Sequence, residues 1–323
     1  MLIKSGRRKF VRETVLVVCR LPDPHVDAVR QYFEIDDKLI IWDLNNPGKT
    51  NLSVRLDELR SSPHPRSVWW RYKATTAEYH GASTPATAFA SREWLAFLRS
   101  LAFILQKSLW INNPVLLSHR YHKVANLLEA RRIGFKIPET LVTNSATELR
   151  QFQRRYRRVI YKPLTYYFEP PDVALFTSRV PIDASDTLES YLALAPCIFQ
   201  KEIVKSYELR VTIVGSQVFA VRINSQDFPR TELDWRREQM NTSLYSIVDL
   251  NSKLRRKLLR LHRNLGLVYG AYDFIVDKKG ELVFLEVNPS GQWLWLEQAT
   301  GISISAAVAS LLKSPRSLSR AHA

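Results

Sequence analysis

The sequence predicts an α/β protein made of α+β lobes, and three observations support this fold class. Short apolar runs of strand length, at residues 14–19 and 159–163 for example, alternate with segments whose apolar residues recur at helical spacing. Near the C-terminus, two strand-like runs flank a polar break that contains glycine. The length of 323 residues suggests two or three lobes rather than one compact domain.

The composition is that of a globular protein with an excess of positive charge. Hydrophobic residues make up 46% and charged residues 24% of the chain, which argues against global disorder. The net charge of +16 favours an anionic partner, such as nucleic acid, a membrane surface, a nucleotide or an acidic peptide. Basic residues cluster in several runs, at 4–12, 154–158, 253–263 and 313–320, and solvated surface is the alternative explanation for these runs.

The sequence indicates a protein of a reducing compartment. Two cysteines, Cys19 and Cys197, are too few for a disulfide framework or a thiolate metal site. The basic segment 7–12 mimics a twin-arginine export signal, but the apolar run 15–19 is too short for the hydrophobic part of such a signal. No run reaches the length of a membrane span. We therefore expect a cytoplasmic protein.

The first third of the chain shows an α/β pattern. No glycine-rich phosphate loop follows its first strand, which argues against a P-loop or a dinucleotide-binding fingerprint. The first lobe is therefore not the expected nucleotide site. The expected strands and helices, in chain order, are a buried strand at 14–19, a helix at 27–33, strands at 39–41 and 68–72, and a long helix at 88–109.

The middle of the chain predicts two helices and two strands. Gly134 ends the first helix, and Ser145 or Asn144 caps the second. The expected elements are a turn at 110–114, a helix at 120–132, a strand at 137–143 leading into the capped helix, and a strand at 159–163.

A stretch near the C-terminus, AYDFIVDKKGELVFLEVNPSGQWLWL, predicts a hairpin with strands at 272–276 and 282–287. Side chains alternate along a strand, so Glu286 and Asn288 point the same way, and Asp273 lies beside them if the register allows. Two carboxylates and an amide oxygen suit a hard cation such as Mg²⁺ that also binds phosphate oxygens. The alternative is that these are ordinary surface and turn residues.

The run D-F-I-V-D followed by F-L-E-V-N-P-S-G-Q-W closely resembles the last metal-binding motif of the ATP-grasp ligases. Within that superfamily, the tail at 291–295 and the triplet Asp234-Trp235-Arg236 resemble the peptide maturases that make graspetides, of which microviridin ligases are the best-known kind. The segments NNP, HK, GFKIPETLVTN and VIYKPL occur in the order of that family, and the resemblance extends over residues 14–312.

The resemblance implies an ATP-grasp fold with three domains. The N-terminal pre-ATP-grasp α/β domain would span residues 1–113, the small central domain 114–200, and the C-terminal ATP-grasp domain 201–323.

The resemblance also implies roles in nucleotide binding. Lys123 and Lys162 match the two lysines that ATP-grasp enzymes direct at nucleotide phosphates, although a lone lysine before proline is more often a solvated residue. Glu208 matches an acidic residue that binds the ribose. The link between the two ATP-grasp lobes, which binds the adenine edge through backbone groups, would be formed by Gln200, Lys201, Glu202 and Ile203.

Three arginines, Arg210, Arg222 and Arg236, are the expected catalytic residues. Arg210 and Glu208 are neighbours on one face of an extended strand, so a salt-bridged surface pair is an alternative. Arg222, opposed to Arg210 on the paired strand, would complete a cationic wall for phosphate or acyl-phosphate oxygens. Without the resemblance, Arg236 is a surface charge and Trp235 a core or interface aromatic.

Two stretches have less defined roles. The family has a loop after the second lysine that covers the triphosphate and often contains glycines, whereas residues 164–172 here contain none. The aromatic residues of this loop, Tyr166, Tyr167 and Phe168, are candidates for contact with a peptide. Trp293 and Trp295 are expected to pack under the predicted metal-binding turn at residues 288–291.

By resemblance, the chain is an ATP-dependent, Mg²⁺-dependent ligase of a ribosomally made precursor peptide. It would activate Asp or Glu side-chain carboxylates as acyl phosphates and form intramolecular esters with Ser or Thr, or amides with Lys. Two alternatives stay open at this point. One is a ligase that adds a free amino acid to a peptide or protein, and the other is a non-catalytic basic protein that binds nucleic acid.

The expected partner is the precursor peptide, with a leader and an acidic core that contains Ser, Thr or Lys. We expect neither a nucleic-acid nor a membrane partner, and we expect a homodimer.

Overall fold

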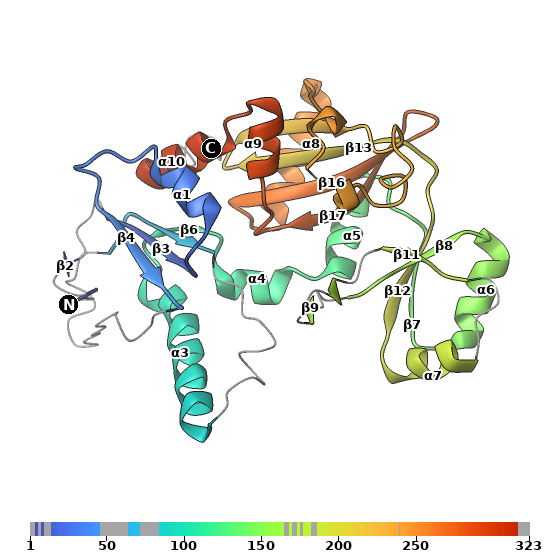
Figure 1. Cartoon of the computed structure of the whole chain (residues 1–323), viewed down its shortest axis with the longest axis horizontal. Helices are drawn as coiled ribbons and strands as arrows, with labels where there is room; N and C mark the ends of the chain where they lie inside the picture. Colours follow the sequence, from blue (N-terminus) through green and yellow to red (C-terminus); the bar gives the residue numbers. More distant parts are fainter. Residues whose placement is uncertain are drawn as a thin grey trace.

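The computed structural model describes residues 4–5, 8–9, 14–45, 64–71, 84–164, 168–169, 173–174, 177–181, 186–238 and 240–315. Within these residues the chain forms three larger sheets with helices around them, which confirms the predicted α/β class. In Figure 1 the first sheet lies at the left, the third at the upper centre and the second at the right. A two-stranded ribbon, β1 (Lys4–Ser5) with β2 (Arg8–Lys9), lies near the N-terminus.

The first sheet is parallel, with the strand order β4-β3-β5-β6. Its strands are β3 (Val15–Cys19), β4 (Leu39–Asp43), β5 (Ser67–Trp70) and β6 (Leu109–Ile111). Every residue of β3 is buried, as expected for an apolar strand that helices cover on both faces of a parallel sheet. The described helices of this lobe are α1 (Pro24–Arg30), which Asp23 caps, and α3 (Pro85–Ile104), which Thr84 caps.

The end of the predicted long helix was wrong. The helix ends at Ile104 rather than at residue 109, and Leu109–Ile111 forms the fourth parallel strand. Ser108 Oγ donates to the carbonyl oxygen of Pro65 at 2.5 Å, and the amide of Leu109 donates to that of Arg66 at 3.1 Å. These contacts with the segment before β5 draw the chain out of the helix and onto the edge of the sheet.

The predicted helix at 120–132 is present as α5 (Lys123–Arg132), and a further helix that the sequence did not predict, α4 (Pro114–Arg120), precedes it. Asn113 caps α4, and its side chain accepts from the amides of Val115 and Leu116. His122 interrupts the helical run because its backbone is extended, and Gly134 ends the segment with a φ of +93° as predicted.

The second sheet is antiparallel and has the strand order β11-β8-β12-β7. Its strands are β7 (Thr140–Thr143), β8 (Val159–Lys162), β11 (Ser178–Arg179) and β12 (Cys197–Lys201). The helices α6 (Ala146–Tyr156) and α7 (Asp186–Leu194) flank it, and Ser145 caps α6 as predicted.

The loop at 164–172 falls largely outside the described residues. Within the loop the structure describes Leu164 and β9 (Phe168–Glu169), which forms a short antiparallel ribbon with β10 (Val173–Ala174) after the loop. The suggested peptide contact through Tyr166, Tyr167 and Phe168 concerns side chains outside the described part of the chain, and it stays a prediction.

The third sheet is antiparallel, with the order β15-β14-β13-β16-β17. Its strands are β13 (Lys205–Val214), β14 (Gln217–Ile223), β15 (Tyr245–Ile247), β16 (Tyr269–Asp277) and β17 (Leu282–Asn288). The predicted hairpin is therefore present as β16 and β17. Two short 3-10 helices, η3 (Trp235–Glu238) and η4 (Thr242–Leu244), lie in the long connection from β14 to β15.

Each face of the third sheet is buried in its own core. On one face, α8 (Ser252–Asn264) and α5 pack against apolar residues of β13 and β16, among them Val211 and Phe274. On the other face, α9 (Leu294–Thr300) and α10 (Ile304–Lys313) pack together with residues of the first sheet, such as Val17 and Trp69. The first lobe and the third sheet therefore share one hydrophobic core.

Trp293 is the central side chain of that shared core. It is 1% exposed, and its ring lies 4.6 Å from that of His25, 5.2 Å from that of Tyr269 and 6.2 Å from that of Trp69. Its indole nitrogen donates to Ser305 Oγ at 2.8 Å. Trp293 thus joins the first lobe to the third sheet, a role that the sequence did not suggest.

Candidate active site

A cavity of about 430 Å³ lies between the second and third sheets. Its lining includes every residue predicted for nucleotide or metal binding, together with Arg210 and Arg236. The lining residues predicted to bind nucleotide or metal are Lys123, Lys162, Gln200, Lys201, Glu202, Ile203, Glu208, Asp273, Glu286 and Asn288. The same cavity is therefore lined by side chains that lie up to 165 positions apart in the sequence, from Lys123 to Asn288.

The hairpin brings the predicted metal ligands to one face of the sheet. Asp273 pairs directly with Glu286, and Asn288 pairs with Ala271 two positions along β16. Arg236 shows that the carboxylates converge, because its Nη2 lies 3.1 Å from Asp273 Oδ2 and 3.3 Å from Glu286 Oε1. One cationic group thus already contacts both carboxylates.

This arrangement fits a hard divalent cation. Asp273 and Glu286 supply carboxylate oxygens aimed at a common point, and Asn288, which lines the same cavity, adds an amide oxygen. Among the described residues there is no cluster of three or more His, Cys, Asp or Glu side chains that could hold a metal. The candidate set therefore depends on Asn288 as its third ligand.

Arg210 and Asp273 form a buried pair across β13 and β16. Arg210 Nη1 donates to Asp273 Oδ1 at 2.7 Å, and the two side chains are 6% and 7% exposed. Arg210 Nη2 also reaches the carbonyl oxygen of Gln292 at 3.4 Å. The alternative of a surface pair between Arg210 and Glu208 is wrong, because both residues are buried and each has another partner.

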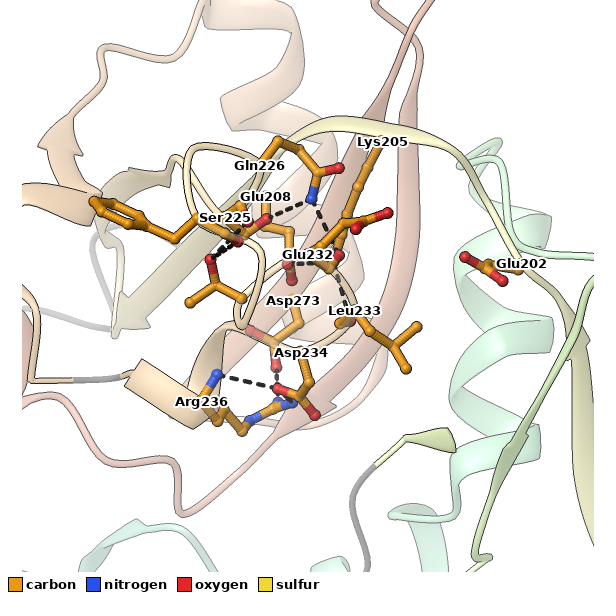
Figure 2. A network of polar contacts seen from close by, with 12 residues as sticks. Glu202, Lys205, Glu208, Ser225, Gln226, Glu232, Leu233, Asp234, Arg236 and Asp273 are labelled. Atoms are coloured by element: carbon orange, nitrogen blue, oxygen red, sulfur yellow. Dashed lines mark hydrogen bonds and ion pairs between the residues drawn. The ribbon is translucent and has the colours of Figure 1, made fainter. Parts of the chain in front are cut away.

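The partner of Glu208 is Lys205, a residue that the sequence interpretation missed. Lys205 Nζ donates to Glu208 Oε1 at 2.6 Å and to the carbonyl oxygen of Leu233 at 3.1 Å (Figure 2). Residues 205 and 208 would point to opposite faces of a regular strand. The register shift between Lys205 and Tyr207 brings them together. No alternation pattern in the sequence could have revealed this pair.

The Asp234-Trp235-Arg236 triplet reaches the cavity through its two charged residues. Asp234 Oδ1 accepts from the amide of Arg236 at 3.1 Å and from its Nη1 at 3.4 Å (Figure 2). Burial opposes the charge of Arg236, but Asp273, Asp234 and Glu286 outweigh burial and raise its pKa. Arg236 is thus part of the site and not a plain surface charge.

Trp235 is a core residue, as its interpretation without the resemblance suggested. It is 3% exposed, and its ring lies 4.6 Å from that of Trp295. Trp295 also lies 4.8 Å from the ring of Tyr245 and lines the cavity. The rings of Trp295 and Tyr245 thus pack against Trp235 and hold the triplet at the edge of the cavity.

The two predicted phosphate-binding lysines come from different elements and meet at the cavity. Lys123 begins α5, and its Nζ donates to the carbonyl oxygen of Pro163 at 2.7 Å, next to Lys162 at the end of β8. Burial lowers the pKa of both lysines, although the carboxylate of Glu286 raises each pKa in part. Two ammonium groups beside the predicted metal ligands suit the phosphates of a nucleotide.

The link between the second and third sheets, residues 200–203, forms another wall of the cavity. Gln200 is buried, and its Nε2 donates to Thr140 Oγ1 at 3.1 Å. Glu202 accepts from both Arg158 and Arg179, with N to O distances between 2.5 and 3.1 Å. Burial opposes the charge of Glu202, but the two arginines lower its pKa overall.

Arg222 does not contribute to the cavity. The strand register places Arg222 opposite Leu209, whereas Val221 lies opposite Arg210. Since directly paired residues share a face, Arg222 and Arg210 lie on opposite faces of the sheet. Arg222 instead donates to Asn224 Oδ1 at 2.7 Å and stacks 4.0 Å from the ring of Tyr207. The predicted wall of Arg210 and Arg222 is therefore wrong.

The fold is similar to that of solved ATP-grasp ligases. One is a ligase from Chryseobacterium gregarium associated with ribosomally synthesised and post-translationally modified peptides (RiPPs), in complex with ADP and a leader and core peptide. It is 26% identical over 94% of this chain and 97% of its own, with a TM-score of 0.77. The macrocyclase MdnC from Microcystis aeruginosa, bound with the precursor peptide MdnA, is 28% identical over 94% of this chain and 100% of its own, also at 0.77.

A third structure supports the fold alone, because its sequence is more distant. The ATP-grasp ligase PsnB, complexed with a minimal precursor, Mg and ADP, is 19% identical over 94% of this chain and 98% of its own, with a TM-score of 0.74. No protein-family model matches the chain, and no curated protein matches it. The structural similarities confirm the predicted ATP-grasp fold.

Proposed function

We propose that this chain, which has the fold of the RiPP-associated ATP-grasp ligases, is an ATP-dependent ligase that forms macrocycles in a precursor peptide. One observation carries the proposal: a single cavity is lined by all the residues predicted to bind nucleotide and metal. The chain shares this fold over 94% of its length with a ligase bound to ADP, leader and core peptide, and with a macrocyclase bound to its precursor.

The nucleotide would lie across the cavity from the link to the hairpin. The backbone of residues 200–203 would bind the adenine edge, and Glu208 would bind the ribose. Lys123 and Lys162 would contact the phosphates, because their ammonium groups interact with the carboxylate of Glu286, a proposed metal ligand. The ion pairs that Glu202 forms with Arg158 and Arg179 would hold the link in position to bind the adenine.

Asp273, Glu286 and Asn288 would hold Mg²⁺. When bound, the ion would neutralise charge on the phosphate oxygens during transfer. Arg236 would have to leave its position between the two carboxylates or share them, since its Nη2 contacts both. A guanidinium released from Asp273 and Glu286 is free to pair with phosphate or acyl-phosphate oxygens.

The proposed reaction has two steps, activation of the carboxylate and ring closure. An oxygen of a peptide Asp or Glu carboxylate attacks the γ-phosphorus of ATP. The bond between the γ-phosphorus and the β-phosphate oxygen breaks, so that ADP departs and the peptide carries an acyl phosphate. A Ser or Thr hydroxyl, or a Lys amine, of the same peptide then attacks the acyl carbon and loses its proton as phosphate departs. The cavity contributes mainly positioning and fixed positive charge.

The proposed partner is a precursor peptide. A net charge of +16 suits an acidic core, and leader and core peptides are bound in the related Chryseobacterium ligase. In the described residues no helix is long and apolar enough to cross a membrane. The homodimer, the cytoplasmic location and the choice between ester and amide stay predictions.

The decisive test is the mass of a peptide product. A small peptide encoded beside this protein, rich in Thr or Ser and in Glu or Asp, would be incubated with the protein, ATP and Mg²⁺. We expect the loss of one water per ring. A gain of the mass of an amino acid would support the rival ligase instead. An unchanged mass, with the leader intact and ATP bound, would contradict cyclisation.

A further inference from the structure

Asn112 is a buried residue of the first lobe whose side-chain amide forms hydrogen bonds with backbone groups at the end of the third sheet. It is 3% exposed and follows β6 directly. Its Oδ1 accepts from the amides of Val268 and Tyr269 at 2.7 and 3.0 Å. Its Nδ2 donates to the carbonyl oxygens of Tyr269 and Pro289 at 2.7 and 2.8 Å. One amide group therefore joins the start of β16 to the turn after β17.

That turn, which we call the metal loop, comprises residues 288–293 and begins at the proposed ligand Asn288. Three further contacts hold it. Tyr269 Oη donates to the carbonyl oxygen of Gly291 at 2.7 Å, and Arg210 Nη2 reaches that of Gln292 at 3.4 Å. The amide of Trp293 donates to His25 Nε2 at 3.1 Å. Backbone groups at four of the six positions are therefore fixed by side chains from outside the loop.

Two of these four contacts come from the first lobe, through Asn112 and His25. Within the described residues, the first lobe contributes no side chain to the lining of the cavity. His25 is itself held, because it is 6% exposed and its Nδ1 lies 3.5 Å from Asp23 Oδ1. Asp23 in turn accepts from Arg71 Nε at 2.5 Å. The first lobe therefore reaches the site through the metal loop, by these two contacts with its backbone and by ring contacts with Trp293.

The loop has little room to adopt another path. A Cβ atom at Gly291 would lie 2.6 Å from the Cβ of Ala271 and 2.8 Å from Arg210 Nη2. Asn288 Oδ1 also accepts from the amide of Ser290 at 2.9 Å, so the ligand side chain is oriented by the loop that follows it. A shift of the loop backbone would move that amide oxygen relative to Asp273 and Glu286.

We infer that Asn112 and His25 are positioning residues, which fix the metal loop and thereby place Asn288 for the metal. The inference rests on the proposed function, because it assigns the first lobe a part in the geometry of the proposed magnesium site. Partners that orient a metal ligand commonly change metal affinity by roughly 10- to 100-fold when they are removed.

The variant Asn112→Asp tests the inference with the smallest change in shape. A carboxylate can still accept from Val268 and Tyr269, but it cannot donate to the carbonyl oxygens of Tyr269 and Pro289. The matched control is Asn113→Asp at the next position. Asn113 caps α4 and Asp is an equally good cap, so the control should change nothing at the loop.

The measurement is the binding of Mn²⁺, as a spectroscopic substitute for Mg²⁺, to the full chain with ADP, by electron paramagnetic resonance at low temperature. Circular dichroism would establish that each variant is folded. We expect Asn112→Asp to bind Mn²⁺ about 10- to 100-fold more weakly than the original chain. We expect Asn113→Asp to bind it equally well.

An Asn112→Asp variant that melts at a lower temperature but binds Mn²⁺ with unchanged affinity would overturn the inference, because Asn112 would then only stabilise the fold. If Asn112→Asp does not fold, His25→Phe decides in the same way, since it removes the acceptor for Trp293 and keeps an aromatic ring beside the indole. If the original chain binds no Mn²⁺ with ADP, the proposed function fails and the inference fails with it.

Discussion

Arg210 and Asp273 face each other in directly paired positions of β13 and β16, with Arg210 Nη1 2.7 Å from Asp273 Oδ1. The pair is almost fully buried, and the second carboxylate oxygen of Asp273 accepts from Arg236 at 3.1 Å. Asp273 therefore has two charged partners before any metal binds. The same carboxylate is therefore a proposed metal ligand and a contact that stabilises the third sheet.

The first prediction concerns the stability of this pair. Arg210→Leu should lower the free energy of unfolding by roughly 3–5 kcal/mol, because it leaves the Asp273 carboxylate buried with one partner fewer. The double variant Arg210→Leu with Asp273→Leu should recover part of that loss, since neither charge of this pair remains buried. Urea unfolding of the two variants checks this. A double variant that is less stable than the single one would contradict the account.

The second prediction concerns Glu286 as a metal ligand. Glu286→Gln should abolish turnover and leave the fold intact, because it removes a charged oxygen ligand without changing the shape of the side chain. Glu281→Gln is the matched control on the same hairpin. Glu281 is exposed and pairs with Lys136 at 2.8 Å, away from the cavity lining. Assays of ADP release and melting temperatures compare the two, and an active Glu286→Gln would refute the metal site.

The third prediction concerns the cost of burying Lys162. Burial lowers the pKa of this lysine below its unfolded value of about 10.5, so charging it in the folded protein costs stability. That cost is absent above the unfolded pKa, grows as the pH falls from the unfolded pKa to the lower folded pKa, and is fully present below the folded pKa. Lys162→Met should therefore be more stable than the original chain at neutral pH and equally stable near pH 11.

Melting temperatures between about pH 7 and 11 check the Lys162→Met prediction. The same variant should bind ATP more weakly, because a proposed phosphate contact is lost. Equal stability of the two chains at neutral pH would mean that the ammonium of Lys162 is well solvated in the folded protein.

The fourth prediction concerns the tight approach at Gly291. Gly291→Ala should destabilise the chain by about 1–3 kcal/mol and reduce turnover, because the new methyl group would lie 2.6 Å from the Cβ of Ala271 and 2.8 Å from Arg210 Nη2. Adding Ala271→Gly removes the first of these two clashes and should restore part of the stability. Unfolding curves would show it, and no recovery in the double variant would place the strain at Arg210.

Much of the fold followed from local patterns in the sequence. The buried strand β3, the cap at Ser145, the end of a helix at Gly134 and the hairpin of β16 and β17 depend on neighbouring residues, so the sequence alone predicted them. Strand β6 escaped prediction because Leu109 continues the apolar pattern of α3 and because residues 110–114 suggested a turn, which was wrong for Trp110 and Ile111. Its contacts to Pro65 and Arg66, far along the chain, decide its conformation.

The candidate site divides in the same way. The chemistry of the predicted hairpin selected Asp273 and Glu286, whereas the resemblance to the ATP-grasp ligases selected Lys123, Lys162 and Arg236. Lys205 and Asn112 could not be selected on chemical grounds. A register shift turns Lys205 toward Glu208, and a contact 157 positions away gives Asn112 its partner in Tyr269. Arg222 shows the converse, since the right residue type lies on the wrong face of the sheet.

The sequence determined which chemical groups this protein has and the local elements that carry them, because caps, turns and alternation act over a few residues. Only the tertiary structure decided which groups meet. Strand register sets the face on which each side chain lies, and the core shared by the first lobe and the third sheet sets how the metal loop is held. Both depend on packing between distant segments, which no short stretch of sequence encodes.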